Sequence, residues 1–191
     1  MSGQPRFTQY LAGIIALLLL TATVSPANRA SAPADSRPLS AEVSSLEIEM
    51  LQTINNIRTR AGLTPLQFDV RSLDMAEEQA LDMAERGYFD HMRPGLPDRK
   101  SESFGERVRR FGFRGSVGEN LGTSSGYSAQ ESLRVAVDGW MRSPGHRANI
   151  LNPNYQFTGI AHYRWAERLS LRRGNRVQWH DNWVQTFFSP R

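Results

Sequence analysis

The stretch WMRSPGHR, residues 140–147, decides how this chain is interpreted. Its first residues close an apolar pattern at helical spacing. Pro144 and Gly145 end that pattern, because proline cannot continue a helix and glycine favours a turn. His146 follows at once, so its imidazole is presented from a helix end. An imidazole in this setting is a candidate metal ligand or general acid–base group.

Two polar residues upstream extend this pattern. His91 closes YFDH, residues 88–91, and Glu119 lies in VGENL, residues 117–121. Two imidazoles and one carboxylate would bind a divalent metal and leave positions for water, provided that the fold brings them together. The chain has no cysteine ligand and no HExxH helix. Asp90 and Asn120, beside these residues, are interpreted as structural groups that satisfy turn and loop backbone.

The order of these segments resembles the CAP superfamily of cysteine-rich secretory proteins, antigen 5 and pathogenesis-related proteins, in its bacterial SCP-like form. The resemblance is carried by GEN at 118–120 and SPGHR at 143–147, and it runs from about Leu46 to Phe188. It implies an α+β fold, a single α-β-α sandwich with an antiparallel sheet. It also implies one cleft for a ligand or for zinc or another divalent metal, lined by three residues: His91, Glu119 and His146.

The chain departs from the superfamily pattern in two ways. The pattern has a second acidic residue three positions after the tryptophan, where this chain has Ser143. Catalysis by paired carboxylates is therefore not favoured, and we expect Ser143→Glu to strengthen metal binding. Animal and plant members are usually disulfide-bonded, whereas this chain has no cysteine, which favours a bacterial source.

The N-terminus reads as a secretory signal. Arg6 precedes an apolar run at 11–24, and small residues follow it up to Ala27. The run is shorter than the ~20 residues of a spanning helix, so a retained membrane anchor is the weaker interpretation. We expect a signal peptide over 1–27, a flexible linker over 28–43, and one domain over 44–191. The protein is expected to be secreted or periplasmic.

The pattern within the domain predicts helices first and a hairpin last. Capping boxes at Ser44 and Ser128 begin two helices, and another runs from Asp69 or Ser72 to Gly87. Short helices are expected at 104–111 and after Pro144, and strands at 157–165 and 177–188. The glycine-rich stretch 112–126 is expected to turn tightly or to lie against another part of the fold, and Trp140 is assigned to the core.

The net charge of +4 comes almost entirely from arginine. One cluster lies at 107–114 and another at 164–176. They favour either contact with an anionic surface or, as the stronger interpretation, a solvated face. Nucleic acid is not expected as a partner, because no stacking motif accompanies the charge. The sequence does not decide the oligomeric state.

Three functions fit these features. The first is a binding module for a cell-envelope or extracellular ligand, which would be a lipid, a glycan or a peptide. The second is a metal-dependent hydrolase of the envelope, and the third is a non-catalytic structural or interaction domain. The fold alone does not select among them. We favour the binding module, and an enzyme is the weaker expectation.

Overall fold

The computed structural model describes residues 44–171 and 174–191. The signal peptide and linker expected over 1–43 lie outside the described residues. The helices are α1 (Ser45–Arg60), α2 (Val70–Arg86), α3 (Phe104–Arg110), α4 (Ala129–Arg142) and α5 (Pro144–Ile150), and the strands are β1 (Gln67–Phe68), β2 (Gly115–Ser125), β3 (Phe157–Leu171) and β4 (Gly174–Pro190).

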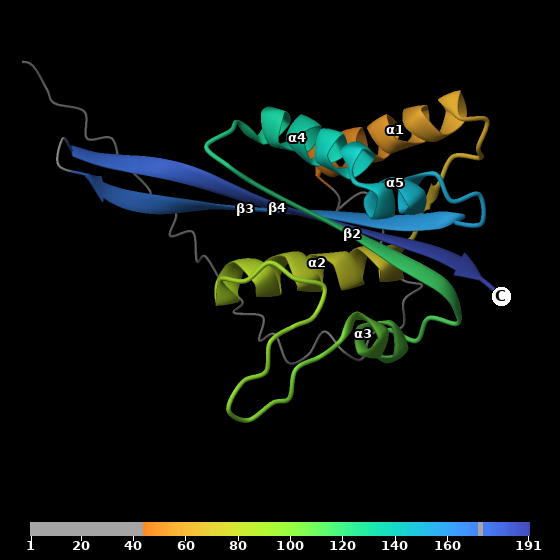
Figure 1. The fold of residues 1–191 in the computed structure, drawn as a ribbon, viewed down its shortest axis with the longest axis horizontal. Coiled ribbons are helices and arrows are strands. Elements are labelled where there is room, and N and C mark those ends of the chain that lie inside the picture. Colours follow the sequence, from red (N-terminus) through yellow and green to blue (C-terminus); the bar gives the residue numbers. More distant parts are fainter. Residues whose placement is uncertain (1–43, 172–173) are drawn as a thin grey trace, which may run out of the picture. The chain divides into compact units, whose positions relative to one another are not determined.

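Within the described residues the strands form one four-stranded sheet in the order β1-β3-β4-β2. β3 pairs antiparallel with β4, and β4 pairs antiparallel with β2, while the short β1 lies parallel to β3. Helices α1, α4 and α5 cover one face of the sheet, and α2 and α3 lie on the other (Figure 1). The predicted α-β-α sandwich is confirmed.

The helix boundaries follow from capping groups in the sequence. The side chain of Ser44 accepts a hydrogen bond from the N–H of Glu47, whose carboxylate accepts one in return, and Ser128 begins α4 in the same way. Asp69 caps the start of α2, and Gly87 ends it at a φ of 66°, in the left-handed region. The predicted helix starts and stops are therefore confirmed.

Of the two alternatives for 112–126, a tight turn or close approach to another part of the fold, the structure has the second, because most of the stretch is the edge strand β2. Each residue from Gly115 to Ser125 faces a partner on β4. The glycines serve close packing instead: a Cβ at Gly118 would lie 2.6 Å from the Tyr155 hydroxyl, and one at Gly122 would lie 3.2 Å from the Ala136 Cβ. The glycine-rich composition thus reflects helices and side chains that approach the strand.

The described residues form three apolar clusters on the two faces of the sheet, and two of them are larger. The first packs α1 and α4 against the sheet around Trp140 and Trp183, and the second packs α2 against it around Leu73 and Val184. Trp140 is buried, as predicted, and its indole N–H donates to the Leu121 carbonyl at 2.8 Å. None of the helices in residues 44–171 and 174–191 has the length and apolar character that crossing a membrane requires.

A buried arginine ties α1 to the segment after α5. The Arg58 guanidinium is fully buried, and burial lowers its pKa from the ordinary value. It donates to the carbonyls of Thr64 at 2.9 Å, Ile150 at 2.7 Å, Asn152 at 2.9 Å and Tyr155 at 3.1 Å. These four carbonyl oxygens accept the hydrogen bonds of the buried guanidinium, which has no carboxylate beside it among the described residues. The same hydrogen bonds fix the position of the end of α5.

Candidate functional site

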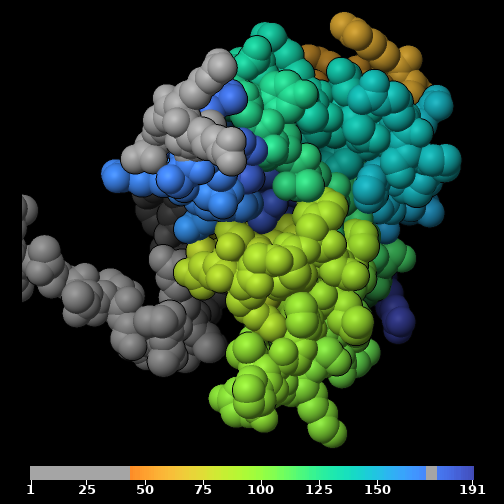
Figure 2. Space-filling model, turned by 60° about the vertical axis from the view of Figure 1, so that its left-hand side comes forward, coloured from red at the N-terminus to blue at the C-terminus, as the bar shows by residue number. Residues whose placement is uncertain are grey.

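The three predicted residues come from three different elements at the free edge of β2. Glu119 lies on β2, His91 in the segment after α2, and His146 on α5. His91 approaches from the α2 side of the sheet, and His146 comes from the α4–α5 side. Their rings lie 6.4 Å apart between centroids at an interplanar angle of 54°. Figure 2 shows the His91 segment in lime next to the α4–α5 segment in teal.

Glu119 and His91 are in direct contact. The His91 Nδ1 lies 2.8 Å from the Glu119 Oε1. The Glu119 side chain is 1% exposed, whereas the His91 side chain is 49% exposed. A buried acid thus orients a solvent-facing imidazole, the arrangement found behind many metal-binding and catalytic histidines.

Arg107 on α3 is the residue of this site that the sequence interpretation missed. Its Nη2 donates to both oxygens of Glu119, at 2.7 and 2.6 Å, and its Nη1 donates to the His91 carbonyl. The Arg107 side chain is 0% exposed. The expectation that it belongs to a solvated arginine face was therefore wrong. Its position between Phe104 and Phe111 on the apolar stripe of α3 is the signal that could have revealed it.

The Arg107–Glu119 pair sets the hydrogen-bonding pattern of His91. Glu119 is a carboxylate here, because both of its oxygens accept hydrogen bonds from a guanidinium. A carboxylate only accepts, so the Nδ1 of His91 must carry the shared hydrogen. In the neutral ring, Nε2 is then the unprotonated nitrogen. This nitrogen can accept a hydrogen bond from a ligand or coordinate a cation.

His146 is held through its backbone. The Asn120 side chain donates to the His146 carbonyl at 3.1 Å and accepts from the Asn149 side chain at 2.9 Å. Asn120 therefore has the predicted structural role. The pKa of His146 is lowered from its ordinary value, first by burial and then by the neighbouring His91. Both effects favour the neutral imidazole.

The segment that carries His91 is supported by buried polar side chains of α2 and the following residues. Gln79 donates to the Asp90 carbonyl at 2.8 Å and accepts from the Nε of Arg93 at 2.8 Å. The Asp90 carboxylate accepts from the Met92 N–H at 2.9 Å, which confirms its role in a turn. Gln79 and Arg93 are themselves buried, so the backbone on both sides of His91 is fixed.

The donor set only partly fits the predicted metal. No group of three His, Cys, Asp or Glu residues within 44–171 and 174–191 is placed to hold a metal ion. Glu119 does not fit as a direct ligand, because Arg107 and His91 occupy its oxygens. It fits the indirect role of orienting a ligating histidine. The imidazoles of His91 and His146 remain, and zinc or another divalent metal at this pair stays a prediction.

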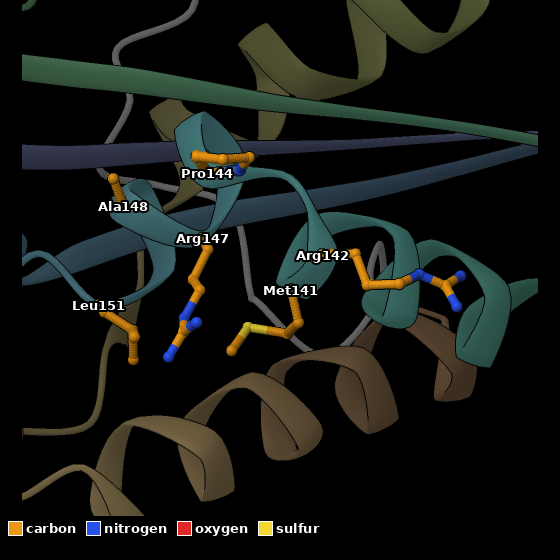
Figure 3. Close-up of a pocket in the computed structure, with 6 residues that line it drawn as sticks. All are labelled: Met141, Arg142, Pro144, Arg147, Ala148 and Leu151. Carbon is orange, nitrogen blue, oxygen red and sulfur yellow. The ribbon is translucent and has the colours of Figure 1, made fainter.

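A separate cavity of about 350 Å³ opens between α4 and α5 (Figure 3). Met141 and Arg147 point into the space above α1, whereas Arg142 points away from it. The residues that line this cavity do not include the three predicted site residues. The titratable side chains of the candidate site meet instead at the edge of β2.

The family model described as "Cysteine-rich secretory protein family" (CAP) matches residues 51–187, which is most of the chain. The chain belongs to the CAP family. Its solved relatives include an extracellular SCP-domain protein from Bacillus anthracis, with a TM-score of 0.55 and 25% identity over 75% of this chain and 40% of that one. A second is an outer surface protein of Borrelia burgdorferi, with a TM-score of 0.54 and 20% identity over 76% and 93% of the two chains.

A relative found by sequence similarity is the uncharacterized protein YkwD of Bacillus subtilis. It is 34% identical over 122 residues, which are 63% of this chain and 43% of YkwD. The chain thus spans less than half the length of that relative and of the Bacillus anthracis protein. The family-model match establishes the family, and the solved structures share the fold. The two solved structures are of proteins named for an extracellular or outer-surface location.

The lowered pKa of His146 predicts how stability depends on pH. The neutral ring is favoured in the folded state, so the unfolded chain takes up a proton more readily. The free energy of unfolding should therefore fall as the pH drops from about 6.5 toward the lower folded-state value. NMR titration of the His146 ring should give a midpoint below that of a free histidine. A midpoint at or above the free value would contradict this, and His146→Gln should flatten this part of the stability profile.

Proposed function

We propose that this CAP domain is exported and binds a cell-envelope or extracellular ligand at the pair His91–His146. The observation that carries the proposal is the buried Arg107–Glu119 ion pair, which orients a half-exposed imidazole toward solvent. Burying two opposite charges costs free energy, so stability alone does not account for the Arg107–Glu119 ion pair. The pair holds the His91 ring so that its Nε2 is presented in a fixed direction, and this role accounts for it.

Binding is favoured over acyl transfer by what surrounds the two rings. The His91 ring hydrogen-bonds to Glu119, and no serine, threonine or tyrosine hydroxyl among the described residues is bonded to either ring. A histidine that activates a side-chain nucleophile needs that hydroxyl within hydrogen-bonding reach. Among the described side chains no such hydroxyl contacts either ring, and the pair is better suited to accept hydrogen bonds from a ligand.

The chemistry of the pair favours a glycan or a peptide as the ligand. Two neutral imidazoles accept hydrogen bonds from hydroxyl or amide groups, which both classes supply in quantity. Phe89 and Met92, close to His91 in the sequence, are exposed and are candidates for apolar contact with a ligand. Sugar rings and peptide side chains use such contacts, whereas a lipid chain would need a deeper apolar groove.

Binding to glycan and peptide fractions of the envelope, measured by calorimetry, tests the proposal. His91→Ala should weaken binding by about tenfold or more, because a hydrogen bond to a fixed acceptor is lost at a partly buried site. The matched control is His180→Ala, which removes an imidazole bonded to Glu167 on the β3–β4 hairpin. Equal affinity for both variants and the parent protein would contradict the proposal.

Zinc belongs in the same experiment, because the two imidazoles are its candidate ligands. We propose that any zinc bound by this domain is lost in both His91→Ala and His146→Ala, and that Ser143→Glu strengthens its binding by adding the acidic residue that this chain lacks. When bound, zinc would polarise water or a carbonyl oxygen. Hydrolysis of an envelope polymer only in the presence of zinc would replace the binding module with the hydrolase.

A further inference from the structure

The far end of the β3–β4 hairpin is a two-stranded ribbon. β2 ends at Ser125, which pairs with His180, so residues 166–171 and 174–179 pair only with each other. Both strands run past the ends of α2 and α4 (Figure 1). Side chains on this ribbon are therefore largely outside the two helical layers.

One face of the ribbon gathers exposed apolar side chains. Directly paired residues share a face, so Ala166 lies with Trp179 and Arg168 with Val177. Val177 is 52% exposed and Trp179 is 45% exposed. Tyr127, also 45% exposed, is tied to the same place, because the Gly126 N–H donates to the Trp179 carbonyl at 2.8 Å. We call Tyr127, Arg168, Val177 and Trp179 the ribbon patch.

The surroundings of the ribbon patch are cationic. Among its described residues 164–171 and 174–176, the β3–β4 hairpin holds a single acidic residue, Glu167, and three arginines, Arg164, Arg168 and Arg176. Glu167 is hydrogen-bonded to His180, and Arg164, whose guanidinium lies 4.9 Å from the Trp179 ring centroid, is paired with the buried Asp181. Arg168 is exposed and has no acidic partner among the described residues. The ribbon thus combines an uncompensated positive charge with exposed aromatic and aliphatic side chains.

From this combination we propose that the ribbon patch docks the domain on an anionic lipid bilayer. Tryptophan and tyrosine are enriched at membrane–water interfaces, and arginine next to the surface is attracted by anionic headgroups. A soluble polyanion would use the arginines but would gain nothing from exposing Val177 and Trp179. The proposal is independent of the ligand at the histidine pair, which is built from other residues on β2, α5 and the segment after α2, so each can fail without the other.

The proposal is tested by measuring how the protein, isolated from its own cells, binds to lipid vesicles. Phosphatidylcholine vesicles with phosphatidylglycerol should bind the protein, and vesicles of phosphatidylcholine alone should bind it far less. Trp140 and Trp183 are buried and Trp165 is half-buried, so comparison with Trp179→Phe assigns the fluorescence change to the exposed Trp179. Brominated lipid should quench the parent protein and should quench Trp179→Phe much less, a readout that ties the contact to the ribbon patch.

Charge and apolar contact can be separated with matched variants. Arg168→Glu should lower the partition onto anionic vesicles by about tenfold. Arg60→Glu, the same reversal at the exposed C-terminal end of α1, should have little effect. Val177→Ser should weaken binding, whereas Leu96→Ser, at another exposed apolar residue, should not. Equal partition of all variants, quenching that does not involve Trp179, or binding to soluble polyphosphate without binding to vesicles would each overturn the proposal.

Discussion

Arg107→Ala should lower the free energy of unfolding by about 3–5 kcal/mol, because it leaves the Glu119 carboxylate buried without its partner. The Glu119 side chain is 1% exposed and both of its oxygens accept from Arg107, so water cannot readily replace the guanidinium. Denaturant unfolding measures the change. The control is Arg109→Ala, two residues along the same helix and exposed, which should stay within about 0.5 kcal/mol of the parent.

A double variant separates the structural from the functional part of this pair. Arg107→Met combined with Glu119→Leu removes both charges and should regain much of the lost stability, since an apolar pair of similar volume avoids the cost of burying ions. The same variant should still lose ligand binding, because nothing then orients His91. A single Arg107→Ala change no more harmful than Arg109→Ala would show that the ion pair does not form.

Trp140→Ala should cost about 3–5 kcal/mol, the range for deleting a large buried aromatic side chain. Trp140 lies in the core between α4 and the sheet, and its indole N–H donates to the Leu121 carbonyl, so a cavity and an unpaired buried acceptor appear together. Trp179→Ala is the matched control, because that tryptophan is exposed on the hairpin. The two denaturation midpoints should differ clearly, and similar midpoints would contradict the assignment of Trp140 to the core.

Local signals predicted the elements of this fold well. Ser44, Asp69, Ser128 and Gly87 act on backbone groups within a few residues, so their effect can be predicted from sequence alone. For the stretch around Gly118 the composition left two alternatives, a tight turn or close approach to another part of the fold, and did not identify a strand. Its glycines are required by Tyr155 and Ala136, which are distant in the chain, and the pairing with β4 overrides the preference of glycine for turns.

The candidate site likewise contains residues that the sequence could identify and one that it could not. His91, Glu119 and His146 could be selected because their short motifs resemble a family pattern, although nothing local requires them to meet. Arg107 carries no such motif and is surrounded by other arginines, so its charge suggested solvent exposure. Its place on the apolar stripe of α3 indicates that it is buried, but only the structure identifies Glu119 as its partner. Burial of a charge depends on a partner that sequence spacing does not identify.

Arg58 has a consequence for how the molecule assembles. Its bond to the Ile150 carbonyl joins residues 92 positions apart in the chain. Closing so long a loop is entropically costly and is expected late in folding. The end of α5, and with it the place of His146, is therefore completed only when the first helix has docked. A fragment that begins after α1 would keep every residue of the histidine pair and still lack the anchor that positions one of them.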